Sequence, residues 1–357
     1  MKTYRNIRNA FGAGSLSGTV RGAACVLRRV VLTACVIVGA LSCHRRPLED
    51  PDLRTAVKIT IDTDGIQNVT CDVYNPNIPL QKIEPTVMHV IFYDAATDNV
   101  VSENFLTGVS TDDEGRRVIS GEVQLAPGEY RMLAYDFGTE EAKVKDYYLW
   151  GKTLAYTDPV PSSVLTRFAT KGEDTPNIIR EPEHLEVARK ELETIPYHDA
   201  IWTVEATARS VVESWYIQVH VDGVQWVNSA QAVLSGMASG NYIEQDLRVT
   251  EPEATAWFEL KKSQDAGKDV VCTVFNTFGH IPDATDHLEI TFDVSTVDKK
   301  IIRKTFDITE LFKSENAVKH HWLLIDETIK VEPPESSGGA FDPKIDDWDE
   351  VHKEIDI

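Results

Sequence analysis

The sequence predicts an all-β protein with two tandem β-sandwich domains. From Arg54 onward, apolar residues alternate with polar ones far more often than they follow helical spacing. The alternating runs are short, and turn-forming sequences such as Asp62-Thr-Asp-Gly65 and Ala126-Pro-Gly128 separate them. Many short strands joined by tight turns are typical of a sandwich, and the roughly 315 residues that follow an apolar leader are enough for two domains.

The first domain is predicted over 54–170, after a tether over 43–53. Its strands are the runs in which apolar residues fall at every second position, so that one face of each strand can be buried. The predicted strands are 57–61, 69–74, 87–93, 100–106, 117–125 and 130–137.

Residues 171–195 are predicted to form a linker between the domains. Pro182 precedes 183–193, which has the composition of a helix, so we expect a short helix there. The second β-domain follows over 196–332. Its predicted strands are 201–206, 214–221, 231–235, 256–260, 270–278, 288–294, 300–307 and 320–325, with a single helical turn at 308–312.

The last segment, 333–357, is predicted to be an exposed acidic tail, because a Pro-Pro-Glu-Ser-Ser-Gly-Gly stretch leads into a run of carboxylates. Such carboxylates are ligands that calcium takes, but no glycine-shaped loop frames them, which favours a solvated tail. The tail also carries apolar residues, Trp348 among them. A tail that folds back on the sandwich, or lies along a sheet edge of this chain or of a partner, therefore stays open as an alternative.

Residues 1–42 predict a signal peptide, and Cys43 predicts a lipid anchor. Arg28-Arg29 precedes an uncharged apolar stretch over 30–40, which suits the core of a signal peptide and is too short to cross a bilayer. It ends in Ala40-Leu-Ser-Cys43, which resembles a relaxed form of the lipobox cut by the lipoprotein signal peptidase. The alternative is ordinary secretion with cleavage near Ala40.

Lipidation of Cys43 would hold the protein at the outer membrane. Several acyl chains on the cysteine matter here, because one chain gives only marginal binding to a bilayer. Basic residues, His44-Arg-Arg46, follow the cysteine in place of an acidic run, so the sequence leaves open which face of the membrane carries the protein.

The mature chain is strongly acidic, which disfavours a nucleic-acid partner. The whole chain has a formal charge of −21, and the leader holds six basic residues and no acidic one, so the remainder carries −27. Beyond Cys43 only Cys71 and Cys272 remain, too few for a disulfide framework or a CxxC metal site. Two buried free thiols in separate strands are favoured over a disulfide, which would need their backbones to come close.

No motif predicts an enzyme, a cofactor site or a metal site. Gly236-Met-Ala-Ser-Gly240 differs from a G-x-S-x-G nucleophile turn because its serine comes one place late, so we predict a turn at a strand end. Adjacent His320 and His321 would point to opposite faces of a strand, which disfavours a shared metal ion. Some aromatic residues could stack on a glycan, although aromatic residues in strands are more typical of a core. These residues are Tyr147, Tyr148, Trp150, Trp215, Trp226 and Trp257.

Four segments together carry a resemblance. They are the lipobox-like ending at Cys43, the strand-turn-strand over 123–135, the glycine-containing segment 234–240, and the closing segment 325–334 with its Gly-Gly and Asp-Asp-Trp tail. With these segments the chain resembles the fimbrillin and fimbrial-anchor lipoproteins of Bacteroidales, in particular their relatives of the domain-of-unknown-function type.

The resemblance implies two transthyretin-like sandwich domains and a non-catalytic role in surface fimbriae, as anchor, minor subunit or adhesin that pairs with other subunits strand to strand. It also implies that major subunits of the family are cut by an arginine-specific protease, which frees a groove for a strand of the next subunit. Arg45, Arg46 and Arg54 are the nearest candidates for such a cut here. A glycan-binding surface lipoprotein of a polysaccharide-uptake system is the alternative function.

Overall fold

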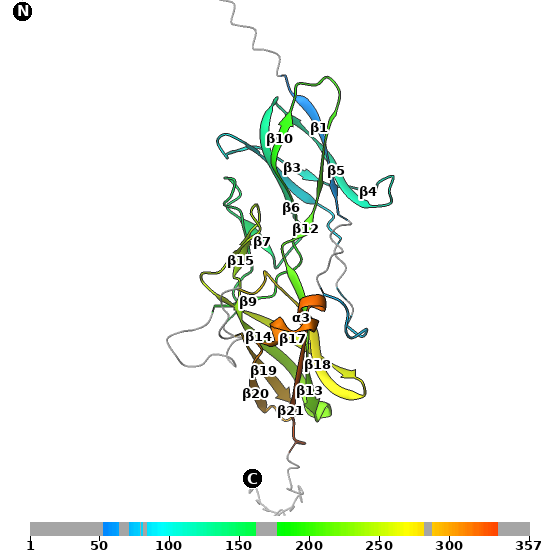
Figure 1. Cartoon of the computed structure of the whole chain (residues 1–357), viewed down its shortest axis with the longest axis vertical. Coiled ribbons are helices and arrows are strands. Elements are labelled where there is room, and N and C mark those ends of the chain that lie inside the picture. The colour runs from blue at the N-terminus through cyan, green and yellow to red at the C-terminus, as the bar shows by residue number, and fades with distance from the viewer. Residues whose placement is uncertain are drawn as a thin grey trace, which may run out of the picture. The chain divides into compact units, whose positions relative to one another are not determined.

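The computed structural model describes residues 53–63, 71–78, 80, 84–161, 177–281 and 288–334. The leader, Cys43, the tether up to residue 52 and the tail from residue 335 lie outside these residues. Strands dominate the described part of the chain (Figure 1), so the predicted all-β class is confirmed. None of the helices in the described part has the length and apolar character to cross a membrane.

The first sandwich packs a four-stranded sheet, in the order β11-β1-β5-β4, against a five-stranded sheet, in the order β12-β10-β6-β2-β3. Side chains from both sheets form one core, which includes Ile59, Val90 and Met132. The strands of this sandwich are β1 (Thr55–Asp62), β2 (Met88–Asp94), β3 (Val100–Leu106), β4 (Gly108–Thr111), β5 (Arg117–Leu125), β6 (Gly128–Asp136), β10 (Glu186–Ile195), β11 (Trp202–Thr207) and β12 (Arg209–Ser210).

Strand β1 lies inside its sheet, not at an edge. It pairs parallel with β11 and antiparallel with β5 along its length. Its side chains alternate, and Val57, Ile59 and Ile61 have no exposed surface. The period-two pattern that predicted this strand therefore reflects one buried face and one that is more accessible.

The helix predicted over 183–193 is wrong, because this segment forms most of β10. Strand β10 pairs antiparallel with β6, and its residues Val187 and Ala188 are buried in that pairing. Tertiary pairing with a central strand outweighs the helical propensity of the isolated segment. The strand predicted at 201–206 exists as β11, but it pairs with β1 of the first sandwich and not with the second block. The strand predicted at 69–74 is wrong over 71–74, which form no strand.

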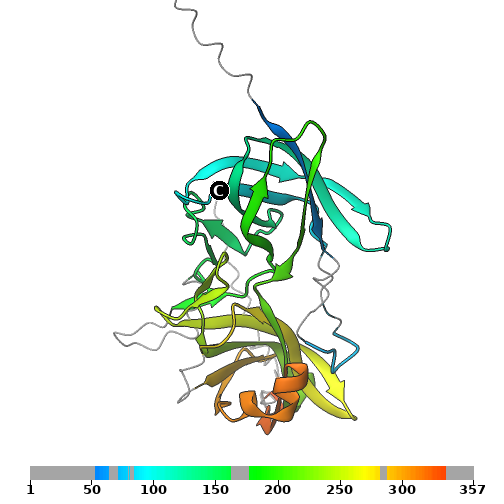
Figure 2. The same cartoon turned by 45° about the horizontal axis from the view of Figure 1, so that its top comes forward.

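The second block is an eight-stranded sheet, in the order β20-β19-β14-β17-β18-β13-β21 with β9 pairing to β17. Strand β17 pairs with β14 up to Leu260 and with β18 from Lys261, so it passes from one layer to the other. Strands from both layers contribute side chains to a single core. Figure 2 shows the strands of this block in a second view. The strands are β9 (Ile178–Arg180), β13 (Glu213–Asp222), β14 (Val227–Met237), β17 (Ala254–Asp265), β18 (Lys268–Thr277), β19 (Glu289–Thr296), β20 (Ile301–Asp307) and β21 (Trp322–Lys330).

Short helical segments precede the last strand. The helical turn predicted at 308–312 appears slightly later, as the 3-10 helix η3 (Leu311–Lys313), and the helix α3 (Glu315–His320) follows it. A second 3-10 helix, η2 (Val224–Trp226), joins β13 to β14. The strand predicted from residue 320 begins at Trp322 instead, because His320 ends α3 and His321 adopts a left-handed conformation as its cap.

A small sheet joins segments that are distant in sequence. Its order is β16-β15-β8-β7, formed by β7 (Lys143–Lys145), β8 (Leu154–Tyr156), β15 (Gly240–Tyr242) and β16 (Leu247–Val249). A hydrophobic cluster contains Tyr93 and Leu133 of the first sandwich together with Val212, Ala238 and Phe278. Because β8 pairs with β15, the segments 143–156 and 240–249 belong to one sheet.

Candidate functional site

Cys43, the predicted lipidation site, lies outside the described residues and stays a prediction. The described residues offer two other features on which a function can be built. These are the free edges of the sheets, which can accept a strand from a partner, and a pocket on the first sandwich.

Strand β3 is the least protected edge of the first sandwich. The edge strands β4 and β12 have only four and two residues, whereas β3 has seven residues and pairs with β2 alone. Strand β3 contains no lysine and no proline, the residues with which natural edges are commonly blunted. Its side chains Val101 and Phe105 are 49% and 47% exposed, so the edge presents apolar surface to solvent.

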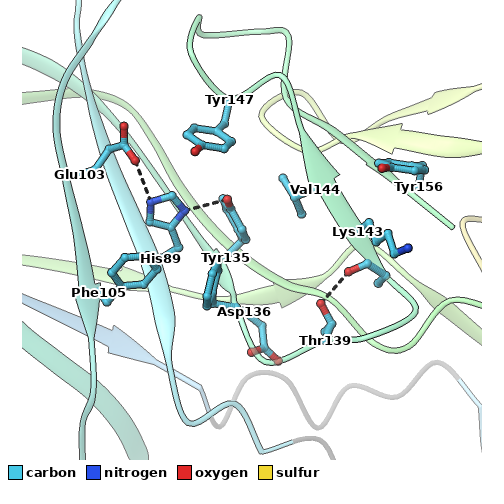
Figure 3. Close-up of a pocket in the computed structure, with 12 residues that line it drawn as sticks. His89, Glu103, Phe105, Tyr135, Asp136, Thr139, Lys143, Val144, Tyr147 and Tyr156 are labelled. Carbon is cyan, nitrogen blue, oxygen red and sulfur yellow. Dashed lines mark hydrogen bonds and ion pairs between the residues drawn. The ribbon is translucent and has the colours of Figure 1, made fainter. Parts of the chain in front are cut away.

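A pocket of about 450 Å³ lies beside β3, and Figure 3 shows its lining. Strands β2, β3 and β6 supply one wall, and the segment that contains β7 and β8 supplies the other. This volume falls in the range of small-molecule sites, about 300–1,000 Å³. The lining residues are His89, Glu103, Phe105, Tyr135, Asp136, Phe137, Thr139, Ala142, Lys143, Val144, Tyr147 and Tyr156.

His89 is the buried centre of this pocket. Its Nδ1 lies 2.7 Å from the Tyr135 hydroxyl, and its Nε2 lies 3.3 Å from a carboxylate oxygen of Glu103. The Phe105 ring stacks on the imidazole with 4.7 Å between ring centroids. Burial lowers the pKa of His89 below its ordinary value, although the neighbouring Glu103 opposes that shift. The imidazole is therefore neutral near pH 7, and it lies beside the Glu103 carboxylate without cancelling the charge of that group.

Carboxylates outweigh cations in the pocket. Glu103 is partly exposed, and Asp136 is nearly buried beside the backbone N–H of Gly138, which donates to it over 2.9 Å. Burial raises the pKa of Asp136. The one lysine of the lining, Lys143, forms an ion pair with Asp158. The pocket thus combines aromatic rings with negative charge, the chemistry that binds a cation.

A buried carboxylate that sequence analysis did not single out lies on β10. Glu186 has no exposed surface, and both of its carboxylate oxygens lack a hydrogen-bond partner among the described residues. Burial raises the pKa of Glu186 to about 8, with a further contribution from Asp136. The sequence pattern gave no signal for this residue, because 183–193 resembled a helix on which Glu186 would be an ordinary surface residue.

The structure separates the paired histidines. His320 contacts Asp72, whereas His321 stacks on Trp215 with 4.1 Å between ring centroids. The described residues contain no group of three His, Cys, Asp or Glu side chains that could hold a metal ion. The expected reason for the separation, opposite faces of one strand, is wrong, since neither histidine belongs to a strand.

Cys71 and Cys272 are both free and buried, as predicted. They belong to one hydrophobic cluster with Tyr216, and only Cys272 lies in a strand, β18. The turn predicted at 236–240 is confirmed, because β14 ends at Met237 and β15 begins at Gly240.

The aromatic residues considered for glycan binding mostly belong to the packed interior. Trp215 is buried, and Tyr147, Trp150, Trp226 and Trp257 pack against the hydrophobic clusters. Tyr148 is the exception, with 67% of its surface exposed. None of the tryptophans in the described ranges is exposed, so these residues provide no flat tryptophan platform for a sugar.

Comparisons with known proteins identify a curated relative and similar solved structures. A curated protein of Bacteroides ovatus, named as a candidate fimbrium anchoring subunit, Fim4B, is 21% identical over 338 residues, which are 86% of this chain and 91% of that protein. The crystal structure of a candidate adhesin from Bacteroides ovatus matches with a TM-score of 0.56 and 20% identity, over 82% of this chain and 98% of the other. The fimbrial anchor protein Mfa2 of Porphyromonas gingivalis matches at 12% identity and a TM-score of 0.44, over 77% of this chain and 90% of the other.

A family model also matches the chain. It describes a domain of unknown function, DUF5119, and covers residues 66–259. This range spans more than half of the sequence and includes β3, the pocket and the small sheet. The adhesin structure of Bacteroides ovatus supports a shared fold, since its alignment extends across nearly all of that chain.

Proposed function

The chain belongs to the DUF5119 family, and from this membership and its similarity to Fim4B we propose that it is a lipid-anchored, non-catalytic subunit of a surface fimbrium. It would act as the anchoring subunit, or as another minor subunit or adhesin, and pair with its neighbours strand to strand. Its place would be the outer membrane, held there by acyl chains on Cys43. The leader would span 1–42 and the tether 43–53.

The single observation that carries this proposal is the position of β1. A subunit that polymerises by accepting a strand must first vacate a groove, yet β1 occupies the middle of its sheet between β5 and β11. Arg54 directly precedes β1, and the next arginine in the sequence is Arg116, just before β5. A cut at Arg45, Arg46 or Arg54 would therefore leave β1 joined to the rest of the sandwich.

This arrangement favours an anchor over a polymerising stalk subunit. Because no arginine lies between β1 and β2, an arginine-specific protease has no place to release β1 by itself. With β1 retained and those sites uncut, the chain stays continuous from Cys43 to the sandwich. We also propose that the first domain includes β10 to β12 and that the second begins near β13, because β11 and β12 pair with strands of the first sandwich.

Lipidation at Cys43 has a direct test. In cells fed labelled palmitate, the full-length chain should carry the label and fractionate with membranes, and Cys43→Ala should lose both properties. Cys35→Ala is the matched control, because it removes a thiol from the leader and leaves the lipobox-like sequence intact. Label that persists in Cys43→Ala would show that the anchor lies elsewhere.

The fimbrial role has its own test. We expect the protein to co-purify with filament subunits, and we expect that association to weaken when the tail after Pro333 is deleted. The comparison should use membrane-bound protein in both cases, so that lost anchoring is not mistaken for lost pairing. Filament assembly that is unchanged in a clean knockout would contradict the proposal.

A further inference from the structure

The outer face of β3 carries a strip of exposed side chains. Glu103 and Phe105 lie on it opposite Ile91 and His89 of β2, and the exposed Val101 follows at a register shift in the strand. Phe137, which is 55% exposed, contacts Phe105 with 4.8 Å between ring centroids. Exposed apolar side chains that gather in one place mark interaction sites more often than isolated ones do.

The other long edges in the described part of the chain are better protected. Strand β20 carries Arg303 and Lys304, and β21 carries the exposed pair Asp326 and Glu327. Charged residues on an edge discourage another strand from pairing there. The outward side chains of β11 are polar. Strand β3 carries a single charged residue, Glu103, beside the exposed apolar residues Val101 and Phe105, so we take it as the most favourable edge for an added strand.

The pocket overlaps the exposed face of β3. Glu103 and Phe105 belong both to the exposed face of β3 and to the pocket lining. A strand added to β3 would lie about 4.8 Å away, with alternate side chains on the same face as Glu103. A long side chain from that strand can cross Glu103 and reach the pocket, as the side chains of an added strand enter pockets in other cases of strand addition.

From this juxtaposition we propose that β3 and its pocket form the docking site for an extended segment of a partner subunit, with a lysine or arginine side chain seated between Glu103, Phe105 and Tyr147. This inference rests on the proposed function and names the surface and partner chemistry behind the strand pairing. Main-chain hydrogen bonds to the β3 edge supply affinity, and the pocket selects the side chain.

The charge of the pocket decides in favour of a basic side chain. The carboxylate of Glu103 faces it, whereas the Asp136 side chain turns away from His89 and Tyr147 (Figure 3), and Lys143 is already paired with Asp158. Rings of Phe105, Phe137 and Tyr147 line the same space, and an aromatic face attracts an ammonium or guanidinium group. An acidic side chain would meet like charge, and an aliphatic one would leave Glu103 without a cationic partner.

The test uses the full mature chain and a set of synthetic peptides. Each peptide alternates threonine and valine and differs only at its central residue, which is lysine, arginine, norleucine or glutamate. Fluorescence anisotropy of labelled peptides measures affinity, and hydrogen exchange of the bound protein locates the contact. We expect the lysine and arginine peptides to bind about tenfold more tightly than norleucine, a ratio that corresponds to about 1.4 kcal/mol.

Two variants separate charge from packing. Glu103→Gln should remove most of the lysine preference and leave norleucine binding unchanged, whereas Glu122→Gln, which alters an exposed carboxylate on β5, should have no effect. Methylation of the peptide backbone should abolish binding of every peptide. Protection from hydrogen exchange should appear at Val101–Phe105.

Equal affinities for all four peptides, or an equal loss in Glu103→Gln and Glu122→Gln, would overturn the proposal. Protection at β20, β21 or β11 instead of β3 would do the same. Binding of a glycan array without binding of any peptide would assign the pocket to sugars and also overturn it. Peptide binding that holds while co-purification with filaments fails would leave this docking site standing and refute the fimbrial role alone.

Discussion

A chain that begins at residue 63, and so lacks β1, is expected to lose the folded first sandwich. Strand β1 contributes Val57, Ile59 and Ile61 to the core, and none of the three has exposed surface. Full burial of three branched aliphatic side chains stabilises a fold by about 6 kcal/mol. The free energy of unfolding of a whole domain is about 5–15 kcal/mol, so this loss alone is comparable to the total stability of a domain.

The backbone raises the cost further. Removal of β1 leaves the facing edges of β5 and β11 without their partner strand, because β1 pairs with both over most of its length. The Thr55 hydroxyl also donates to the Pro196 carbonyl over 2.7 Å and accepts from the His198 N–H, which ties β1 to the segment after β10. We expect the truncated chain to aggregate, because the exposed edges accept strands from other molecules.

A peptide of residues 53–63 supplies the control, since it restores the missing strand without a covalent bond. Circular dichroism and a thermal melt of residues 63–357 should show a folded first sandwich when this peptide is present in excess. The same peptide with Ile59→Asn should fail to restore it, because the amide would replace a buried side chain. A truncated chain that melts like the mature protein without any peptide would contradict the expectation, and would weaken the argument that β1 makes this subunit unable to accept a donor strand.

Elements with one buried face could be predicted from the sequence. Strands β1 and β3 alternate between less and more exposed positions, and their predicted runs match the structure closely. The pattern is informative because the side chains of successive residues point to opposite faces, and only one face meets the core.

Strand β10 could not be predicted, for a physical reason. Its sequence, with Ala188, Arg189, Lys190 and Leu192, favours a helix when the segment is taken alone. The partner that holds it extended, β6, lies some fifty to seventy residues earlier, and a register shift after Lys190 interrupts the alternation of the strand. Local propensity carries no information about such a distant partner. The two- and three-residue strands, such as β12 and β15, are too short to show any period.

The pocket was missed although five of its twelve lining residues lie in correctly predicted strands. His89, Phe105 and Tyr135 come together because β2 pairs with β3 and with β6 in a specific register, which sets His89 opposite both of the others. The sequence identifies the strands but not their order in the sheet, so it cannot show which side chains converge. The lipid anchor differs from the pocket, because Cys43 is predicted from the sequence alone and lies outside the residues that the structure describes.

Replacing Glu186 with glutamine is expected to stabilise the protein at pH 8 and to have little effect near pH 4.5. Burial raises the pKa of Glu186 from 4.5 to about 8 in the folded chain. Between these values the folded protein keeps a proton that the unfolded chain has lost, so the free energy of unfolding falls as the pH rises. Glutamine has no proton to lose and removes that dependence.

The size of the effect follows from the shift. One pKa unit corresponds to about 1.4 kcal/mol, so the full shift would amount to several kcal/mol, and we expect a gain of about 3 kcal/mol at pH 8. Glu181, whose pKa burial raises to about 7, adds a slope of the same sign to the parent and to the variant alike. His184, whose pKa burial lowers to about 4, destabilises the fold only as the pH falls below 6.5. The difference between variant and parent therefore reports Glu186 together with its interaction with Asp136.

Denaturant unfolding of the mature chain at pH 4.5, 6 and 8 measures this difference. Glu191→Gln is the matched control, because Glu191 lies on the same strand but is exposed, and its substitution should change the unfolding midpoint equally little at every pH. A Glu186→Gln variant that gains the same stability at all three values would show that the carboxylate does not retain its proton in the folded state. A variant that loses stability at pH 8 would show that the Glu186 carboxylate has a stabilising partner, since only a paired charge would be missed when it is removed from a site with no exposed surface.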